Sequence, residues 1–271
     1  MKFKSIGVFD SGFGGLDILK GIVKKLPEYN YIYLGDTARA PYGNRSQEKI
    51  FEFSKQAVDF LFAEGCELVI FACNTASSDA LRRIQQEYLP KKYPNKRVLG
   101  VLIPAVEESV TKTKNSKVGV VATVATVKSE AFIDEFKKVN PKVKVFQKAC
   151  PLLVPIVESG EIKNPATDII IKNYLKPLID KKIDTLVLGC THYGLLENKI
   201  KKAVGPSVSI VSEARVVPDK LSQYLKRHSE IERKLGKNKK IRFCSTDITD
   251  SFQKLGSLFF GKNIKTEQVS L

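Results

Sequence analysis

The sequence has no long apolar run. Its longest clear apolar stretch, from Leu68 to Cys73, is far shorter than the roughly 18 residues of a membrane-spanning helix. The segment from Met1 to Asp10 contains too short an apolar core for a signal peptide. We therefore expect no membrane association, and we expect the protein to remain in the cytoplasm, where it is made.

The cysteine pattern of a disulfide-bonded or zinc-bound protein is also missing. The cysteines are odd in number, and none of them forms a CxxC pair. Together with the expected lack of a signal peptide, this pattern indicates free thiols in a reducing compartment. A chain of 271 residues can bury enough surface to fold without disulfides or metal. The five cysteines are Cys66, Cys73, Cys150, Cys190 and Cys244.

Acidic residues are outnumbered by basic ones. The chain has 45 Lys and Arg against 29 Asp and Glu, a net charge of +16, with a denser basic block at 220–242. The basic residues are mainly lysine, whereas proteins that read bases and phosphates depend on arginine. The block also lacks the repeated aromatic residues of a stacking platform. We therefore expect a solvated lysine surface that favours anionic solutes, and no nucleic acid binding as the main function.

Short β-branched runs alternate with longer amphipathic runs along the whole chain. The segment 47–63, for example, places Ile50, Phe53 and Ala57 on one stripe of a helix. This alternation predicts an α/β fold with largely parallel, doubly wound sheets. The expected strands are Ser5–Phe9, Tyr29–Leu34, Leu68–Ala72, Val98–Ile103, Lys117–Ala122, Lys142–Phe146, Thr185–Leu188, Val208–Val211 and Ile241–Cys244.

Two segments of the chain are repeated. Ile6–Ser11 resembles Val118–Thr123, since both are strands that end in a small hydroxyl residue. Val69–Ala76 resembles Val187–His192, since both are strands that end in cysteine and polar residues. The repeats occur in the same order at similar spacing, so they predict two pseudo-symmetric halves.

These repeats and the breaks at Pro104 and Gly205-Pro206 set the expected domain boundaries. We expect one α/β domain from residues 1–103 plus 208–271 and a second from residues 104–207. Ligands bind beyond the carboxyl ends of the strands in such sheets. If the halves face each other, Cys73 and Cys190 enter one cleft from opposite sides.

The residues around both cysteines favour thiol chemistry. Cys73 precedes Asn74 and Thr75 at the start of a helical run, and Cys190 precedes Thr191 and His192. A cysteine just before a helix experiences the positive end of the helix dipole, so we expect a lowered pKa. The capping side chains can also donate hydrogen bonds to a carboxylate. For either cysteine alone, packing as a buried thiol is the alternative.

A glycine-rich turn, Asp10-Ser-Gly-Phe-Gly-Gly15, follows the first expected strand. A GxGxxG dinucleotide fingerprint would require glycine at position 17, where Asp17 stands, so that fingerprint is excluded. We expect Ser11 and backbone donors to bind an anionic group, with Asp10 as a base or orienting residue beside a thiol. A purely structural turn is the alternative.

Two further features bear on the site. The polar loop Gly35–Gly43 follows the second expected strand, and Tyr42 with the Gly43 N–H could contact substrate or belong to an ordinary turn. The chain has two histidines. We expect His228 on the surface of the basic block, while His192 is either a functional residue or a satisfied structural histidine.

Four motifs in order resemble the glutamate racemase family: Gly7–Gly15, Gly35–Gly43, Ala72–Ser77 and Gly189–Tyr193. The C-terminal stretch 246–261 also fits. The resemblance implies two pseudo-symmetric α/β domains with the active site in the cleft between them. It also implies a cofactor-independent enzyme without metal that interconverts L- and D-glutamate and supplies D-glutamate for peptidoglycan.

The resemblance assigns roles to individual residues. It implies that Cys73 and Cys190 are the two catalytic acid/bases, that Glu158 orients His192, and that Asp10 and His192 also take part. The family usually has proline where this chain has Gly194, and glycine where it has Ala125. The substrate-lining residues that the resemblance implies are Asp10, Ser11, Tyr42, Gly43, Asn74, Thr75, Thr126, Thr191 and His192.

Other functions fit the same residues. An aspartate or broader amino-acid racemase would share the motifs, because side-chain length is set by pocket shape. A hydrolase with zinc on Cys73, Cys190 and His192, or an amino-acid-binding protein without activity, would also fit. The 36 lysines leave a Schiff base with pyridoxal phosphate open. The oligomeric state is open too, with a homodimer as one arrangement.

Overall fold

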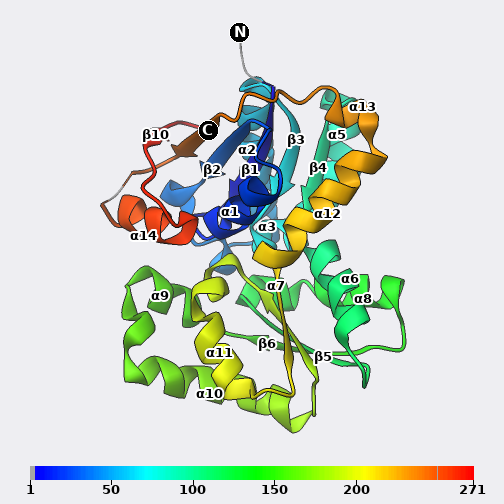
Figure 1. Ribbon diagram of the computed structural model, residues 1–271, viewed down its shortest axis with the longest axis vertical. Helices are drawn as coiled ribbons and strands as arrows, with labels where there is room; N and C mark the ends of the chain where they lie inside the picture. The colour runs from blue at the N-terminus through cyan, green and yellow to red at the C-terminus, as the bar shows by residue number, and fades with distance from the viewer. Residues whose placement is uncertain (1–3, 249) are drawn as a thin grey trace.

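All strands of this computed structural model, which describes residues 4–248 and 250–271, lie in two parallel sheets (Figure 1). Residues 1–3, at the start of the first expected domain, and residue 249 lie outside the described residues. The six-stranded sheet forms the upper lobe in Figure 1 and the four-stranded sheet the lower lobe. The predicted α/β class with parallel sheets and two lobes is confirmed.

The six-stranded sheet has β1 near its centre, in the order β10-β9-β2-β1-β3-β4. All of its neighbouring strands pair in parallel. Its residues are apolar on both faces of β1 and β2, as a sheet covered on both sides requires. The strands are β1 (Ser5–Asp10), β2 (Tyr31–Gly35), β3 (Cys66–Phe71), β4 (Arg97–Gly100), β9 (Ile241–Ser245) and β10 (Thr266–Gln268).

The four-stranded sheet repeats the central part of the larger one. Its order is β6-β5-β7-β8, which corresponds strand for strand to β2-β1-β3-β4. Its neighbouring strands also pair in parallel. The sequence repeats therefore reflect a repeated topology. The strands are β5 (Lys117–Ala122), β6 (Lys144–Ala149), β7 (Thr185–Gly189) and β8 (Ser209–Ser212).

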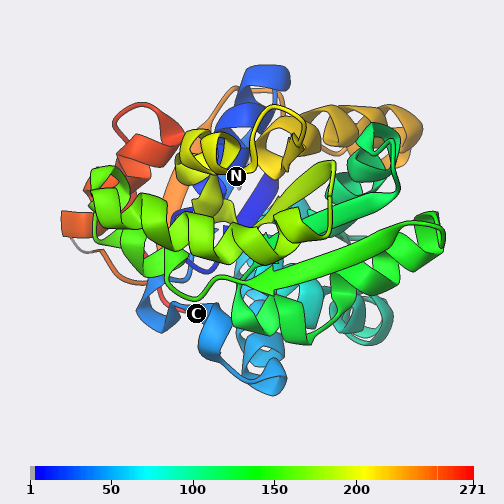
Figure 2. The same ribbon diagram turned by 90° about the horizontal axis from the view of Figure 1, so that it is seen from below.

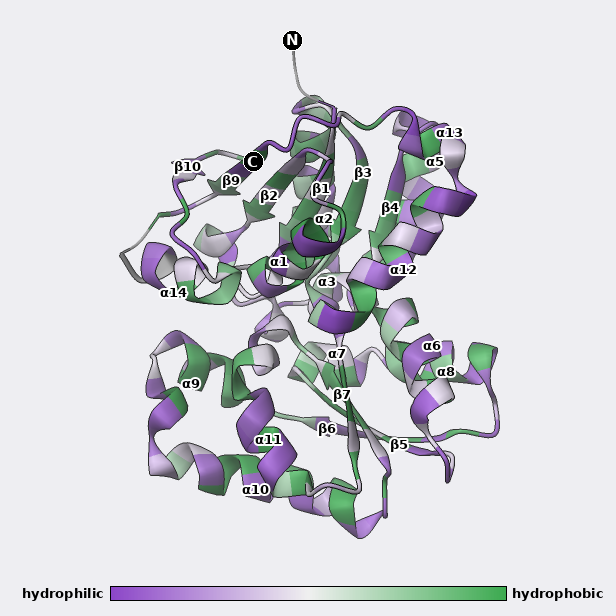
Figure 3. Cartoon of the chain, viewed as in Figure 1, coloured by the Kyte–Doolittle hydropathy of each residue, from purple (hydrophilic) through white to green (hydrophobic). Residues whose placement is uncertain are grey.

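Helices cover both faces of each sheet, as the views in Figures 1 and 2 show. The amphipathic segment 47–63 forms α2 as predicted, and the Ser46 side chain caps it by accepting a hydrogen bond from the Lys49 N–H. Figure 3 shows apolar strands inside and polar helix surfaces outside. The helices of the upper lobe are α1 (Gly15–Lys25), α2 (Gln47–Ala63), α3 (Asn74–Asp79), α4 (Leu81–Arg83), α5 (Leu89–Lys92), α12 (Glu213–Arg227), α13 (Ser229–Glu232) and α14 (Asp250–Phe260).

The lower lobe contains the remaining α-helices, and short 3-10 or π-helical turns occur in both lobes. The α-helices are α6 (Leu102–Lys112), α7 (Val124–Lys128), α8 (Ala131–Val139), α9 (Leu153–Glu158), α10 (Pro165–Asp180) and α11 (Glu197–Val204). The 3-10 turns are η1 (Thr37–Arg39), η2 (Tyr42–Asn44), η4 (Glu161–Lys163) and η5 (Thr191–Leu196), and η3 (Ile84–Tyr88) is π-helical.

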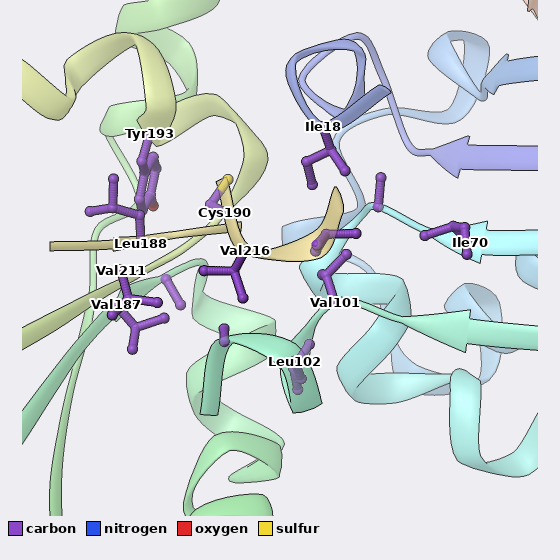
Figure 4. Packing of buried hydrophobic residues seen from close by; sticks show 14 of the residues in the cluster. Ile18, Ile70, Val101, Leu102, Val187, Leu188, Cys190, Tyr193, Val211 and Val216 are labelled. Carbon is purple, nitrogen blue, oxygen red and sulfur yellow. The ribbon is translucent and has the colours of Figure 1, made fainter. Parts of the chain in front are cut away.

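One hydrophobic cluster runs through both lobes. It includes Ile18 and Val101 of the upper lobe, Val187 of the lower lobe, and Val216 at the start of α12 (Figure 4). Since α12 packs against both α1 and α6, it joins the lobes through buried apolar surface. This shared core fixes which faces of the two sheets meet.

The chain returns to the upper lobe later than residue 208, where the sequence placed the boundary. β8 pairs with β7 from Ser209 to Ser212, so this strand belongs to the four-stranded sheet. The crossover occurs after Ser212, the last residue of β8, because α12 begins at Glu213. The apolar pattern of β8 shows that it is a strand but not which sheet it joins, since either sheet offers an edge strand for pairing.

Candidate active site

A small cavity lies where the carboxyl ends of the two sheets face each other. Its volume is about 30 Å³. Segments that follow β1, β3, β5 and β7 all contribute to its wall, as expected for the ligand-binding edge of parallel sheets. The wall consists of Ser11, Gly12, Ala40, Pro41, Tyr42, Gly43, Cys73, Asn74, Thr75, Thr123, Val154, Glu158, Cys190, Thr191 and His192.

Cys73 enters this cavity from the upper lobe. It is the N-cap of α3, and its Sγ accepts a hydrogen bond from the Ala76 N–H at 3.5 Å. The thiol also donates to Ser11 Oγ at 3.4 Å. The chain after β3 therefore holds Cys73 against the turn that follows β1, as the sequence motifs predicted.

Cys190 enters from the lower lobe, directly after β7. Its Sγ lies 3.8 Å from His192 Nδ1, and His192 Nε2 lies 3.1 Å from Glu158 Oε1. The imidazole is buried between Phe13 and Phe259, with ring centroids 5.6 and 5.8 Å away. The three residues thus form a thiol–imidazole–carboxylate chain.

Burial dominates the acidity of both thiols. It raises the pKa of Cys73 to about 12, with the Asp10 carboxyl adding to the rise and the bonds from Ser11 and Ala76 opposing it. Burial likewise raises the pKa of Cys190 well above its ordinary range. The expectation that the helix position would lower these pKa values is therefore wrong, because desolvation of the thiolate outweighs the helix contribution.

Asp10 lies behind the cavity wall. Its carboxylate is fully buried and accepts hydrogen bonds from the Gly12 N–H at 2.9 Å and from Thr191 Oγ1 at 3.3 Å. Burial raises the pKa of Asp10, with His192 opposing the rise. A Cβ at Gly14 would overlap the Thr191 side chain, so glycine in this turn lets the lobes approach closely.

The loop after β2 closes one side of the cavity. The buried Tyr42 donates its hydroxyl to Asp36, which also pairs with Arg39 at 2.7 Å. Tyr42 is part of the cavity wall, and Asp36 already engages its hydroxyl. Gly43 lies against Thr123 of the lower lobe, where a Cβ would come within 3.0 Å of the threonine Cβ.

Thr123, and not Thr126, reaches the cavity wall. Thr123 Oγ1 lies 3.1 Å from Thr75 Oγ1 across the lobes and donates to Thr126 Oγ1 at 3.1 Å, so Thr126 supports it from behind. The resemblance that pointed to Thr126 missed this residue. The internal repeat contained the signal, since Thr123 occupies the position that Ser11 occupies in the first half.

The sequence reasoning also missed Glu213, the first residue of α12. Its side chain is 3% exposed and accepts a hydrogen bond from Asn74 Nδ2 at 2.7 Å. Gly194, where the related family usually has proline, faces Asp17 of α1. A Cβ at position 194 would lie 2.8 Å from Asp17 Oδ2. In this chain the Asp17 carboxylate therefore occupies the space that a larger residue at position 194 would need.

Within residues 4–248 and 250–271, no cluster of three or more His, Cys, Asp or Glu side chains is arranged to hold a metal ion. In the same part of the chain, every helix is too short or too polar to cross a membrane.

Comparison with known proteins gives consistent matches over nearly the whole chain. Glutamate racemase of Persephonella marina is 40% identical over 268 residues, which cover 98% of this chain and 97% of that protein. Glutamate racemase isoform RacE1 of Bacillus anthracis superposes with a TM-score of 0.91 at 34% identity, covering 100% of this chain and 99% of that one. Glutamate racemase of Francisella tularensis, solved in complex with D-glutamate, superposes with a TM-score of 0.88 at 33% identity, covering 100% of this chain and 98% of that one.

The chain also matches the Asp/Glu/Hydantoin racemase family over residues 6–217. That range contains the two cavity cysteines, Cys73 and Cys190, together with the turn after β1 and the His192–Glu158 pair. The relatives have the same fold and nearly the same length. The chain therefore belongs to the Asp/Glu/Hydantoin racemase family, and it is an isomerase of the amino-acid racemase class.

Proposed function

We propose that this protein interconverts L- and D-glutamate by proton transfer between two thiols, without a cofactor. The observation that carries the proposal is the placement of Cys73 and Cys190 in the wall of one cavity, at the ends of corresponding strands in two repeated lobes. The identity of 40% with a glutamate racemase over 98% of the chain supports glutamate as the substrate.

Racemisation requires that a proton leave one face of Cα and that another arrive on the opposite face. In the L-to-D direction, Cys190 as thiolate removes the α-proton and the Cys73 thiol donates its proton to the far face. Cys190 ends as a thiol and Cys73 as a thiolate, and the reverse direction exchanges these roles. The burial that raises both thiol pKa values makes each thiolate a stronger base once it forms.

The carbanion that forms between the two steps needs donors on the α-carboxylate. Ser11, Thr75 and Thr191 are hydroxyl residues of the cavity wall, and the Ala76 N–H in the first turn of α3 donates to Cys73 Sγ. We assign these groups to the substrate carboxylates. His192, held by Glu158, assists Cys190 in taking up and releasing its proton.

The lobes must part to admit the substrate. A cavity of about 30 Å³ has room for one or two water molecules, far less than an amino acid needs. We infer that substrate enters an open form and that closure returns the thiols to opposite faces of Cα. Closure also excludes water, which prevents the carbanion from collecting a proton at random.

In the cell, we propose that the D-glutamate formed here supplies peptidoglycan synthesis. We place the reaction in the cytoplasm, because five free cysteines are typical of a reducing compartment.

A circular-dichroism assay on L- and D-glutamate and on L- and D-aspartate, without added cofactor, tests the proposal. After dialysis against a chelator, we expect both glutamate enantiomers to lose optical activity at full rate, and aspartate to react more slowly. Activity that depends on added zinc or pyridoxal phosphate, or a preference for aspartate, would overturn the proposal.

A further inference from the structure

A buried carboxyl group with no role in the proton transfer lies beside the cavity. Glu213 is 3% exposed, and its Oε2 accepts a hydrogen bond of 2.7 Å from Asn74 Nδ2. Its other oxygen, Oε1, has no hydrogen-bond partner among the described residues. Asn74 is therefore the partner that holds this side chain in place.

The position of Glu213 in the fold links the two lobes. Glu213 follows β8 at the carboxyl end of the four-stranded sheet, whereas Asn74 follows β3 of the six-stranded sheet. Their hydrogen bond therefore ties the first residue after the four-stranded sheet to the upper lobe, whereas the longer bond from Thr191 to Asp10, at 3.3 Å, crosses between the lobes. Glu213 acts on the cavity through Asn74, which is part of the cavity wall.

The bond fixes which end of the Asn74 amide is free. Glu213 Oε2 accepts, so the amide NH₂ group must face it and the carbonyl oxygen must face away. Asn74 Oδ1 is buried and has no hydrogen-bond partner among the described residues. A buried, unpaired carbonyl in the wall of a polar cavity is an acceptor that a ligand donor can satisfy.

Of the polar groups of an amino acid, only the α-ammonium group is purely a donor. We propose that Glu213 is a positioning residue, which holds the Asn74 amide so that its Oδ1 accepts a hydrogen bond from the substrate's α-ammonium group. This inference rests on the proposed function, because it assumes that an amino acid occupies the cavity. Burial raises the pKa of Glu213, and the hydrogen bond from Asn74 opposes the rise.

Two substitutions of similar size separate this role from a structural one. Glu213→Gln keeps a carbonyl acceptor for the Asn74 NH₂ group, whereas Glu213→Met keeps the volume and removes the acceptor. The hydrogen bond to the ammonium group exists in both the ground state and the transition state. Loss of this bond should therefore raise KM and leave kcat unchanged. We expect Glu213→Met to raise KM for both glutamate enantiomers about tenfold with kcat within about threefold, and Glu213→Gln to keep KM within about twofold.

A double-mutant cycle with Asn74→Ala tests whether Glu213 acts through Asn74. In that background we expect Glu213→Met to change KM by less than about twofold. Glu197→Gln, at a half-buried acid paired with Arg215, is the matched control and should leave both constants unchanged. Melting temperatures confirm that each variant is folded.

Three results would overturn the inference while leaving the proposed function intact: an unchanged KM in Glu213→Met, a Glu213→Gln variant as impaired as Glu213→Met, or full additivity with Asn74→Ala. A wild-type protein that does not racemise glutamate would overturn the proposed function itself, and this inference with it.

Discussion

Cys73 and Cys190 follow corresponding strands of two repeated lobes, yet their immediate partners differ. Cys73 is the N-cap of α3, accepts a hydrogen bond from the Ala76 N–H and contacts Ser11 Oγ at 3.4 Å. Cys190 precedes the 3-10 turn η5, makes no side-chain cap, and has His192 Nδ1 at 3.8 Å instead. Helix and hydroxyl donors support one thiol, and an imidazole–carboxylate pair supports the other.

A structural repeat can therefore supply two similar bases whose supporting residues differ. The backbone symmetry places both sulfur atoms at the cavity, while the residues that follow each strand decide how each thiolate is stabilised. Substitutions that affect one side only should therefore affect one direction of the reaction more than the other. Equilibrium forces kcat/KM of both directions to change together, so the difference must appear in kcat and KM separately.

The largest effect is expected from replacing either thiol. Cys73→Ser and Cys190→Ser should each lower kcat by about 10³-fold, because a hydroxyl is a far weaker acid than a thiol and general acid–base catalysis contributes on this scale. Glutamate should still bind, as isothermal titration can check. Cys150→Ser is the matched control, since this buried thiol lies 3.6 Å from the Lys148 carbonyl, away from the cavity wall. Near-normal turnover in either cavity variant would exclude a two-thiol mechanism.

The pH profile should show the raised thiol pKa values. Both thiols are protonated at neutral pH because their pKa values lie above it, so the thiolate fraction grows about tenfold per pH unit. We expect kcat/KM in both directions to rise about a hundredfold between about pH 6.5 and 8.5. A plateau over this range would mean that the free enzyme already carries a thiolate, and the burial argument would fail.

Replacing the imidazole should separate the two sides. Because His192 contacts Cys190, His192→Asn should lower kcat about a hundredfold from L-glutamate and by less from D-glutamate. His228→Asn, at the other histidine, which pairs with Glu230 on the surface, is the control. Equal losses of kcat in both directions would show that His192 serves both thiols, and unchanged constants would remove it from the mechanism.

The smallest effect is expected from the hydroxyl beside Cys73. Ser11→Ala removes one stabilising bond from the Cys73 thiolate and should lower kcat from D-glutamate about fivefold, with a smaller change from L-glutamate. Ser159→Ala, an exposed hydroxyl that bonds the Pro155 carbonyl, should change neither. A larger loss from L-glutamate would reverse the assignment of bases to enantiomers.

Much of this arrangement could be predicted from the sequence. The sequence showed where the strands before Cys73, Cys190 and Ser11 end. A buried strand is a continuous apolar run, and the polar residues that follow it mark its end. The three-residue strand β10 was missed, since Thr266–Gln268 has no apolar pattern. The helical run expected after Cys73 is not one continuous helix, because it is divided into α3, α4 and the π-helical η3.

The parts that could not be predicted depend on tertiary burial. Glu213 looks like an ordinary acid in the first turn of a surface helix, and only the packing of the lobes encloses it. The predicted direction of the thiol pKa shifts was wrong for the same reason, because the desolvation that accompanies burial exceeds the local helix contribution. Thr126 and Thr123 are three residues apart on one short helix turn, so the sequence alone could not show which one faces the cavity.

The most direct test of the two-thiol mechanism is the position of the isotope early in the reaction in deuterated water. The thiol that delivers the proton carries solvent deuterium, while the abstracted proton stays on the opposite thiolate. We therefore predict that mass spectrometry of L- and D-glutamate, separated after a few per cent conversion, finds deuterium at Cα of the product and protium in the remaining substrate, from either direction. Equal deuterium in recovered substrate and product would show one base serving both faces, and would contradict the mechanism.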